Sequence, residues 1–215
     1  MDQVLQYGQV APVAITASLP NGTQSVVRLG NMGETVVSQL HAPLYEATYR
    51  RAKFFGSNGA TPSVTTVALA TTYTGLVLYN PAGTTVNLVV DTVGYSFLVA
   101  FPAAATVGLM VGYAAAGIVT ASAAASPGAS SFVGGGTPSQ GKCALSATLV
   151  GTPVLHTVFG AGLTGAISTA PQNQTIYDMG GSLILPPGAY AAIYTSTASG
   201  AASLAASFQW EEVPV

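Results

Sequence analysis

The side chains that could carry acid–base, nucleophilic or metal chemistry are few in this sequence and lie far apart. Between Phe54 and Trp210 the only charged residues are Asp91, Lys142 and Asp178, and the only histidine is His156. Catalytic proton transfer and metal binding need several such groups close together. The composition therefore predicts that the chain is not an enzyme and that it holds no metal and no cofactor.

The isolated groups that remain have ordinary structural interpretations. His156 lies in an apolar, strand-like run, which is typical of a hydrogen-bonded interior or interface histidine, and its pairing with Asp178 in a triad carries little information in a serine-rich chain. Cys143 is alone and is predicted to be a small core residue. Gly134-Gly135-Gly136 lacks the lysine of a phosphate-binding loop and is predicted to be a linker.

The low charge of the chain bears on how its surface is covered. Hydrophobic residues make up 49% of the 215 residues, which is ordinary, but charged residues make up only 6%, far below the usual quarter. A surface with so few charges is poorly solvated unless other subunits cover it. We therefore expect a homo-oligomer. The net charge of −2 gives no basic surface for nucleic acid.

A membrane-spanning helix is not expected, although the tract from Val93 to Val119 is long and uncharged. Pro102 and several glycines interrupt it, and the nearest basic residues, Lys53 and Lys142, are too distant to set an orientation.

The elements that would position any site are predicted to be short β-strands. From about Ser63 the chain alternates β-branched or aromatic runs with Gly- and Pro-containing turns, which favours an antiparallel β-sandwich over residues 57–215. Asn80-Pro81-Ala82-Gly83 predicts a hairpin turn, and Pro186-Pro187-Gly188 predicts a sharp corner. The stretch Ala121–Gly141 is predicted to be a long surface loop.

The N-terminal part, residues 1–56, differs from this body because it contains most of the charges outside the C-terminus. It is predicted to be an extended docking arm, with Gly56-Ser57-Asn58-Gly59 as the hinge to the body. The candidate partner-docking residues are Arg28, Glu34, His41, Tyr45, Tyr49, Arg50 and Arg51.

Three features together resemble virion structural proteins of tailed bacteriophages. They are the segment from Arg28 to Arg50, an uncharged strand-rich body containing Leu78-Tyr-Asn-Pro, and the corner Leu185-Pro-Pro-Gly-Ala-Tyr. In that family a short N-terminal part precedes a β-sandwich, and members are capsid decoration, cement or head-fibre components. The resemblance implies an all-β sandwich of jelly-roll type with an extended N-terminal arm. It also implies a homotrimer that contacts the major capsid protein or other virion proteins, located in the virion after assembly in the host cytoplasm.

Two other classes of function stay open. A receptor-binding tip of a head or tail fibre would also be a trimeric sandwich, with exposed loop residues such as Tyr113 and Phe132 available for host carbohydrate. A secreted hydrolase or lectin would need converging carboxylates or calcium ligands, but Asp91 and Asp178 are the only carboxylates in the body before Glu211.

Overall fold

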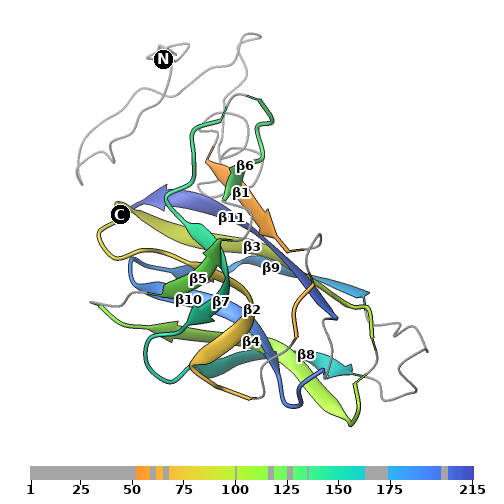
Figure 1. Cartoon of the computed structure of the whole chain (residues 1–215). Helices are drawn as coiled ribbons and strands as arrows, with labels where there is room; N and C mark the ends of the chain where they lie inside the picture. The colour runs from red at the N-terminus through yellow and green to blue at the C-terminus, as the bar shows by residue number, and fades with distance from the viewer. Residues whose placement is uncertain are drawn as a thin grey trace, which may run out of the picture.

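The computed structural model describes residues 52–58, 62–64, 68–99, 101–115, 119–124, 128–134, 136–162, 174–199 and 203–215. All regular secondary structure in these residues is β-strand (Figure 1). The strands are β1 (Lys53–Ser57), β2 (Thr72–Tyr79), β3 (Val86–Phe97), β4 (Ala105–Tyr113), β5 (Thr120–Ala124), β6 (Ala129–Ser130), β7 (Lys142–Thr148), β8 (Val154–Gly162), β9 (Gln174–Leu185), β10 (Ala189–Thr195) and β11 (Leu204–Pro214).

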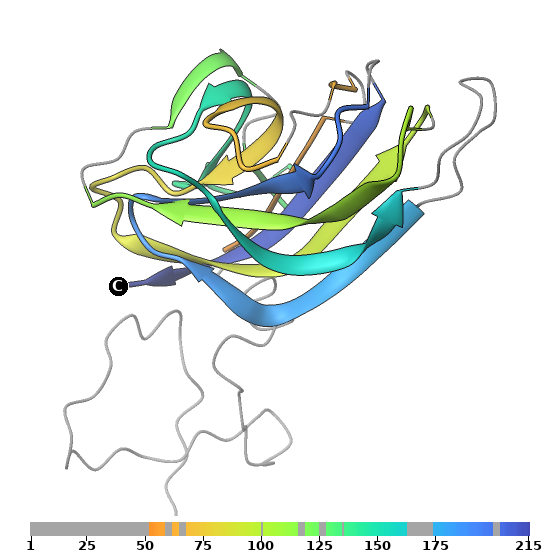
Figure 2. The same ribbon diagram turned by 90° about the horizontal axis from the view of Figure 1, so that it is seen from below.

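The strands form two sheets, and every pairing within them is antiparallel. Sheet 1 has the order β6-β1-β11-β3-β9, and sheet 2 has the order β5-β7-β2-β10-β4-β8. The main core takes side chains from both sheets, so the sheets pack as two layers, which Figure 2 shows from below. The prediction of an all-β protein built from antiparallel sheets in a sandwich-like arrangement is confirmed.

The pairings are nested along the chain. β1 pairs with β11, β2 with β10, β3 with β9, and β4 with β8. The strands β5, β6 and β7 come between β4 and β8 in the sequence and extend the two sheets beside β1 and β2. Most contacts that hold the fold therefore join residues far apart in the sequence.

Alternation along β3 shows how the sequence builds the core. Leu88 and Val90 point into the core, and so do Val93 and Tyr95. Within each pair the residues are two positions apart, but Val90 and Val93 are three positions apart, so the alternation shifts by one residue between them. At that shift Val90 pairs with Trp210 and Thr92 with Gln209, so Asp91 is the extra residue of a β-bulge.

Sheet 2 is buried on both of its faces. Residues such as Leu76 and Leu109 point into the main core, whereas their neighbours Val77 and Met110 belong to a second cluster on the opposite face. Val119 and Leu149, from segments that connect strands, complete that second cluster. Described segments of the chain therefore cover the outer face of the central strands of sheet 2, but not that of β8.

The predicted hairpin at residues 80–83 is wrong. A turn is present, with Gly83 at a φ of +87°, but β2 belongs to sheet 2 and β3 to sheet 1, so the chain crosses between the sheets here. The corner predicted at Pro186-Pro187-Gly188 makes another such crossing, from β9 to β10, with Gly188 at a φ of +95°.

Buried Asn80 joins these two crossings. Its side-chain Nδ2 donates to the carbonyl oxygens of Val86 (2.8 Å) and Leu185 (2.9 Å). Its backbone N–H donates to the Ala189 carbonyl (2.9 Å), and its own carbonyl accepts from the Gly188 N–H (2.8 Å). A single residue thus satisfies backbone groups on both sides of each corner.

The predicted loop over Ala121–Gly141 is wrong in part, because β5 and β6 lie within it. Two of its glycines are required by close packing on Trp210. A Cβ at Gly128 would lie 2.8 Å from Cζ2 of Trp210, and one at Gly141 would lie 3.2 Å from its Nε1. The glycines in this stretch therefore help to pack the core around Trp210, a role that composition alone did not suggest.

The predicted hinge at residues 56–59 is also wrong. Gly56 and Ser57 belong to β1, and the predicted boundary at residue 56 falls inside that strand. Asn58 is buried, accepts from the Ala206 N–H through Oδ1 (2.6 Å) and donates through Nδ2 to the Leu204 carbonyl (3.2 Å). These bonds fix the segment against β11.

We predict that Asn80→Ala lowers the free energy of unfolding by about 2–4 kcal/mol, because buried carbonyl groups of two corners lose their donor. Urea unfolding at one fixed protein concentration, followed by the fluorescence of Trp210, the only tryptophan, measures the change. Asn87→Ala is the matched control, since Asn87 is half-buried on β3. Equal effects of the two substitutions would contradict the role assigned to Asn80.

Candidate functional site

The charged residues of the described chain gather on one sheet. Lys53, Asp91, Asp178, Glu211 and Glu212 all belong to strands of sheet 1, and Lys142 lies on β7 of sheet 2. Within the described ranges, no three His, Cys, Asp or Glu side chains come together as a possible metal site. Sheet 1 therefore contains most of the charged side chains in the described ranges.

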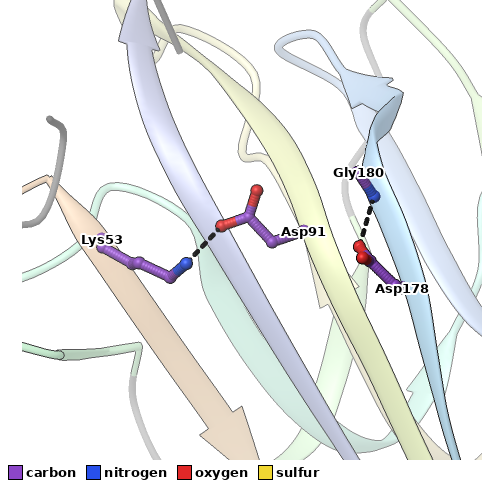
Figure 3. A network of polar contacts seen from close by, with 4 residues as sticks. All are labelled: Lys53, Asp91, Asp178 and Gly180. Atoms are coloured by element: carbon purple, nitrogen blue, oxygen red, sulfur yellow. Dashed lines mark hydrogen bonds and ion pairs between the residues drawn. The ribbon is translucent and has the colours of Figure 1, made fainter. Parts of the chain in front are cut away.

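An ion pair crosses the outer face of sheet 1. The Lys53 side chain on β1 reaches over β11 to Asp91 on β3, with Nζ 2.7 Å from Oδ2 (Figure 3). The side chains are 17% and 8% exposed, so this pair is largely shielded from water. Asp91 faces outward because it follows Leu88 and Val90 in the regular alternation, and the bulge shifts that alternation only after Asp91. The ion pair links β1 to β3 across β11, and its low exposure leaves little access for a substrate.

The other carboxylates with described contacts also bind backbone groups. Asp178 Oδ1 accepts from the Gly180 N–H (2.8 Å) (Figure 3), and Gly180 and Gly181 both have a positive φ. Glu212 is buried, and its Oε1 accepts from Ser139 Oγ (2.5 Å) and the Gly141 N–H (2.8 Å). Such bonds stabilise turns and loops, which is a structural use of the carboxylates.

Burial controls the titration of several groups in sheet 2. Desolvation raises the pKa of the Cys143 thiol to about 12, and the prediction of Cys143 as a core residue is confirmed. Desolvation also raises the pKa of Tyr73 and Tyr190, whose hydroxyls donate to the carbonyl oxygens of Ile193 (2.9 Å) and Val150 (3.0 Å). These groups stay protonated at neutral pH and support the fold.

Of the two positions predicted for His156, interior or interface, the structure excludes the interior one. His156 lies on β8, an edge strand of sheet 2, and is exposed. Its Nδ1 is 2.6 Å from Oγ1 of Thr157. An apolar run in the sequence indicates a strand but does not show whether another strand covers it. Among the described strands none pairs with the outer side of β8, so its apolar residues are exposed together with His156.

Two shallow hollows lie on the outer face of sheet 1. One, of about 270 Å³, is lined by small and hydroxyl-bearing residues that include Ser57, Gly94, Ser96 and Ser207. The other, of about 200 Å³, lies beside Gly180. Both are smaller than typical ligand pockets, and neither is lined by a charged residue.

Large apolar side chains are exposed along β8 and β9. These strands lie at the ends of their sheets, β8 in sheet 2 and β9 in sheet 1. The sequence predicted strands in both regions but could not show that these particular side chains face solvent. The exposed residues are Val154, Leu155, Val158, Ile176, Tyr177 and Ile184.

The docking residues predicted in the N-terminal part are outside the described residues. They are Arg28, Glu34, His41, Tyr45, Tyr49, Arg50 and Arg51. In the described ranges, no helix is long and apolar enough to cross a membrane.

We predict that Lys53→Met lowers the free energy of unfolding by about 1–3 kcal/mol, because it leaves the shielded Asp91 carboxylate without its cation. The double variant Lys53→Met/Asp91→Asn should recover more than half of that loss. Lys142→Met, at an exposed position on β7, serves as the control and should change stability by less than about 0.5 kcal/mol. Urea unfolding of the four proteins gives the comparison, and no recovery in the double variant would argue against the ion pair.

We also predict that the protein loses stability as the pH rises from about 9 toward 12. The unfolded chain releases the Cys143 proton near its ordinary pKa, whereas the folded chain keeps it up to a pKa of about 12. Each pH unit in this window then lowers the free energy of unfolding by up to about 1.4 kcal/mol. In Cys143→Ala this loss should shrink between pH 9 and pH 10. Urea unfolding of both proteins at pH 8, 9 and 10 tests this, and parallel pH dependences would refute it.

Comparison of the chain with protein-family models, with curated proteins and with solved structures found no match. Its function is therefore inferred from its own residues and geometry.

Proposed function

We propose that this chain is a non-enzymatic virion structural protein, a capsid decoration or cement protein of a tailed bacteriophage that works as a homotrimer. One observation carries the proposal: a charge-poor body exposes large apolar side chains along two long edge strands. Soluble monomers rarely leave such surfaces uncovered. Contacts between subunits would cover them.

The uses of the polar groups favour a structural role over catalysis. Asp91 pairs with Lys53, Asp178 binds the backbone of Gly180, and Glu212 binds Ser139 and Gly141. A general acid or base needs a free, accessible group near a site for substrate. These three carboxylates are instead committed to holding strands and turns.

The finer fold assignment in this proposal is a jelly roll. It is supported by the nested pairing in which β1 to β4 meet β11 to β8 in reverse order. A long antiparallel hairpin of four strand pairs that is rolled into two sheets has this pairing. Jelly rolls of eight strands are common in viral capsid proteins, which agrees with the proposed location in the virion.

The N-terminal part is the proposed docking arm. Because β1 pairs with β11, the arm in this proposal is the segment that precedes Lys53. It includes three of the five basic residues of the chain, Arg28, Arg50 and Arg51. We infer that it contacts the major capsid protein or a neighbouring subunit, and that the added buried area raises the barrier to particle rupture.

A receptor-binding fibre tip is the second candidate, and one observation favours it. The larger hollow on sheet 1 presents the hydroxyl-bearing residues Ser57, Ser96, Thr175 and Ser207, which could bind sugar hydroxyls. Sugar sites also use exposed aromatic rings. The one aromatic residue at this hollow, Tyr95, is buried with its ring against Phe97 and Phe159. The structural role is therefore preferred.

We predict that the purified full-length protein sediments as a trimer of 21.5 kDa chains and stays assembled on dilution to about 1 μM, because separation would expose the apolar edge strands. Analytical ultracentrifugation measures this, and a stable folded monomer would refute self-association.

The capsid role needs a separate test on particles. Particles that lack the protein should release their genome at a lower temperature than complete particles, and adding purified protein should restore the difference. Protein without residues 1–51 should not restore it. If complete and depleted particles melt at the same temperature, the cement role is wrong.

A further inference from the structure

We propose that the edge of the sandwich formed by β8 and β9 is the surface that a second copy of this chain covers. The inference rests on the self-association in the proposed function and assigns it to a particular surface. It follows from the position, composition and length of these two strands.

The two strands form one continuous edge, although they belong to different sheets. The rings of Phe159 on β8 and Tyr177 on β9 are tilted against each other with centroids 4.8 Å apart, and Phe159 also stacks on Tyr95 of β3 at 5.6 Å. Figure 2 shows β8 and β9 running next to each other along the lower side of the molecule. Aromatic side chains therefore close the core here, while the outer sides of both strands pair with no strand of the described chain.

Several large apolar side chains along this edge are well exposed, beside exposed polar residues such as His156 and Asp178. Ile176 is 81% exposed, Ile184 and Val158 are each 55% exposed, and Val154 is 59% exposed. Leu155 and Tyr177 are exposed as well. Ile176 lies beside Gly94 on the outer face of sheet 1, and Leu155 lies beside Gly108 on the outer face of sheet 2. Apolar side chains therefore flank this edge on both faces of the sandwich.

The opposite edge of the sandwich is different. There the sheets end in β5, of five residues, and β6, of two residues, and short edge strands resist pairing with other chains. β8 and β9 have nine and twelve residues, contain no proline or lysine, and include Asp178 as their only charged residue. Register shifts interrupt the pairing of both strands, but the strands lack the short length, proline and lysine that usually protect a free edge, which indicates that this edge is covered in the assembled protein.

A second copy of the chain fits this edge better than a partner of opposite charge. One charged residue on two strands gives little basis for electrostatic selection. Another copy offers the same apolar residues and the same unpaired backbone groups. If β8 of one subunit packs against β9 of the next, the contact is head-to-tail, and such contacts can close into a ring of three.

The test introduces a charged side chain into each of the two edge strands. Ile176→Asp and Val158→Asp should each convert the oligomer into folded monomers in analytical ultracentrifugation, with unchanged circular dichroism and Trp210 fluorescence. Val133→Asp is the matched control, because Val133 is 90% exposed but lies outside both strands, and it should leave the oligomer intact. Oligomers that persist in both edge variants would overturn the proposal.

A second measurement does not depend on how the charged variants fold. Single cysteines at Ile176, Val158 and Val133 can be labelled with a maleimide in the native protein, because Cys143 is buried and its thiol stays protonated. In the oligomer, Ile176→Cys and Val158→Cys should react roughly tenfold or more slowly than Val133→Cys, and all three should react alike in urea. Equal native rates would refute burial of the edge.

The outcomes separate this inference from the proposed function. A wild-type monomer would refute both. A wild-type trimer with freely labelled edge cysteines would refute only the β8–β9 contact. If the charged variants stay trimeric but no longer bind particles, a capsid protein covers the edge instead, and the second-copy proposal is wrong.

Discussion

The hydrogen bonds of Asn80 are the interaction on which the arrangement of the two sheets depends. The chain changes sheets at most of its strand connections, and Asn80 lies where two of these corners, after β2 and after β9, come together. Asn80 binds the carbonyl oxygens of Val86 and Leu185 and exchanges backbone bonds with Gly188 and Ala189. These bonds hold the two corners side by side. The pairing of β2 with β10 starts directly beside them, at Tyr79 and Tyr190.

Neutral amide and hydroxyl side chains make many of the hydrogen bonds that join strands in this protein. Asn58 ties the end of β1 to β11, and the Tyr73 hydroxyl binds β10 through Ile193. A neutral side chain loses less solvation energy on burial than an ion does, so it can be enclosed with fewer compensating contacts. This explains how a chain with 6% charged residues can bury polar side chains such as Asn58, Asn80 and Tyr73 with hydrogen-bond partners.

The two edges of the sandwich differ in strand length and in how far they are covered, and this difference bears on self-association. The insertion of β5, β6 and β7 lengthens both sheets beside β1 and β2 and packs Gly128 and Gly141 against Trp210. No comparable insertion in the described chain covers β8 and β9, whose exposed residues include six large apolar side chains. A sandwich with one short-stranded edge and one edge that exposes large apolar residues is suited to self-association, in agreement with the proposed structural role.

The sequence by itself determined the strand class of the body, the core position of Cys143 and the corner at Pro186-Pro187-Gly188, because alternation and turn residues act over a few neighbouring positions. Only the tertiary structure decided that the turn after Asn80 crosses between sheets, that Asn58 is anchored by β11, and that His156 is exposed. A two-residue period shows that a strand has two faces, but not what covers each face. That depends on pairings such as β1 with β11, between residues about 150 positions apart, which packing of the whole chain selects.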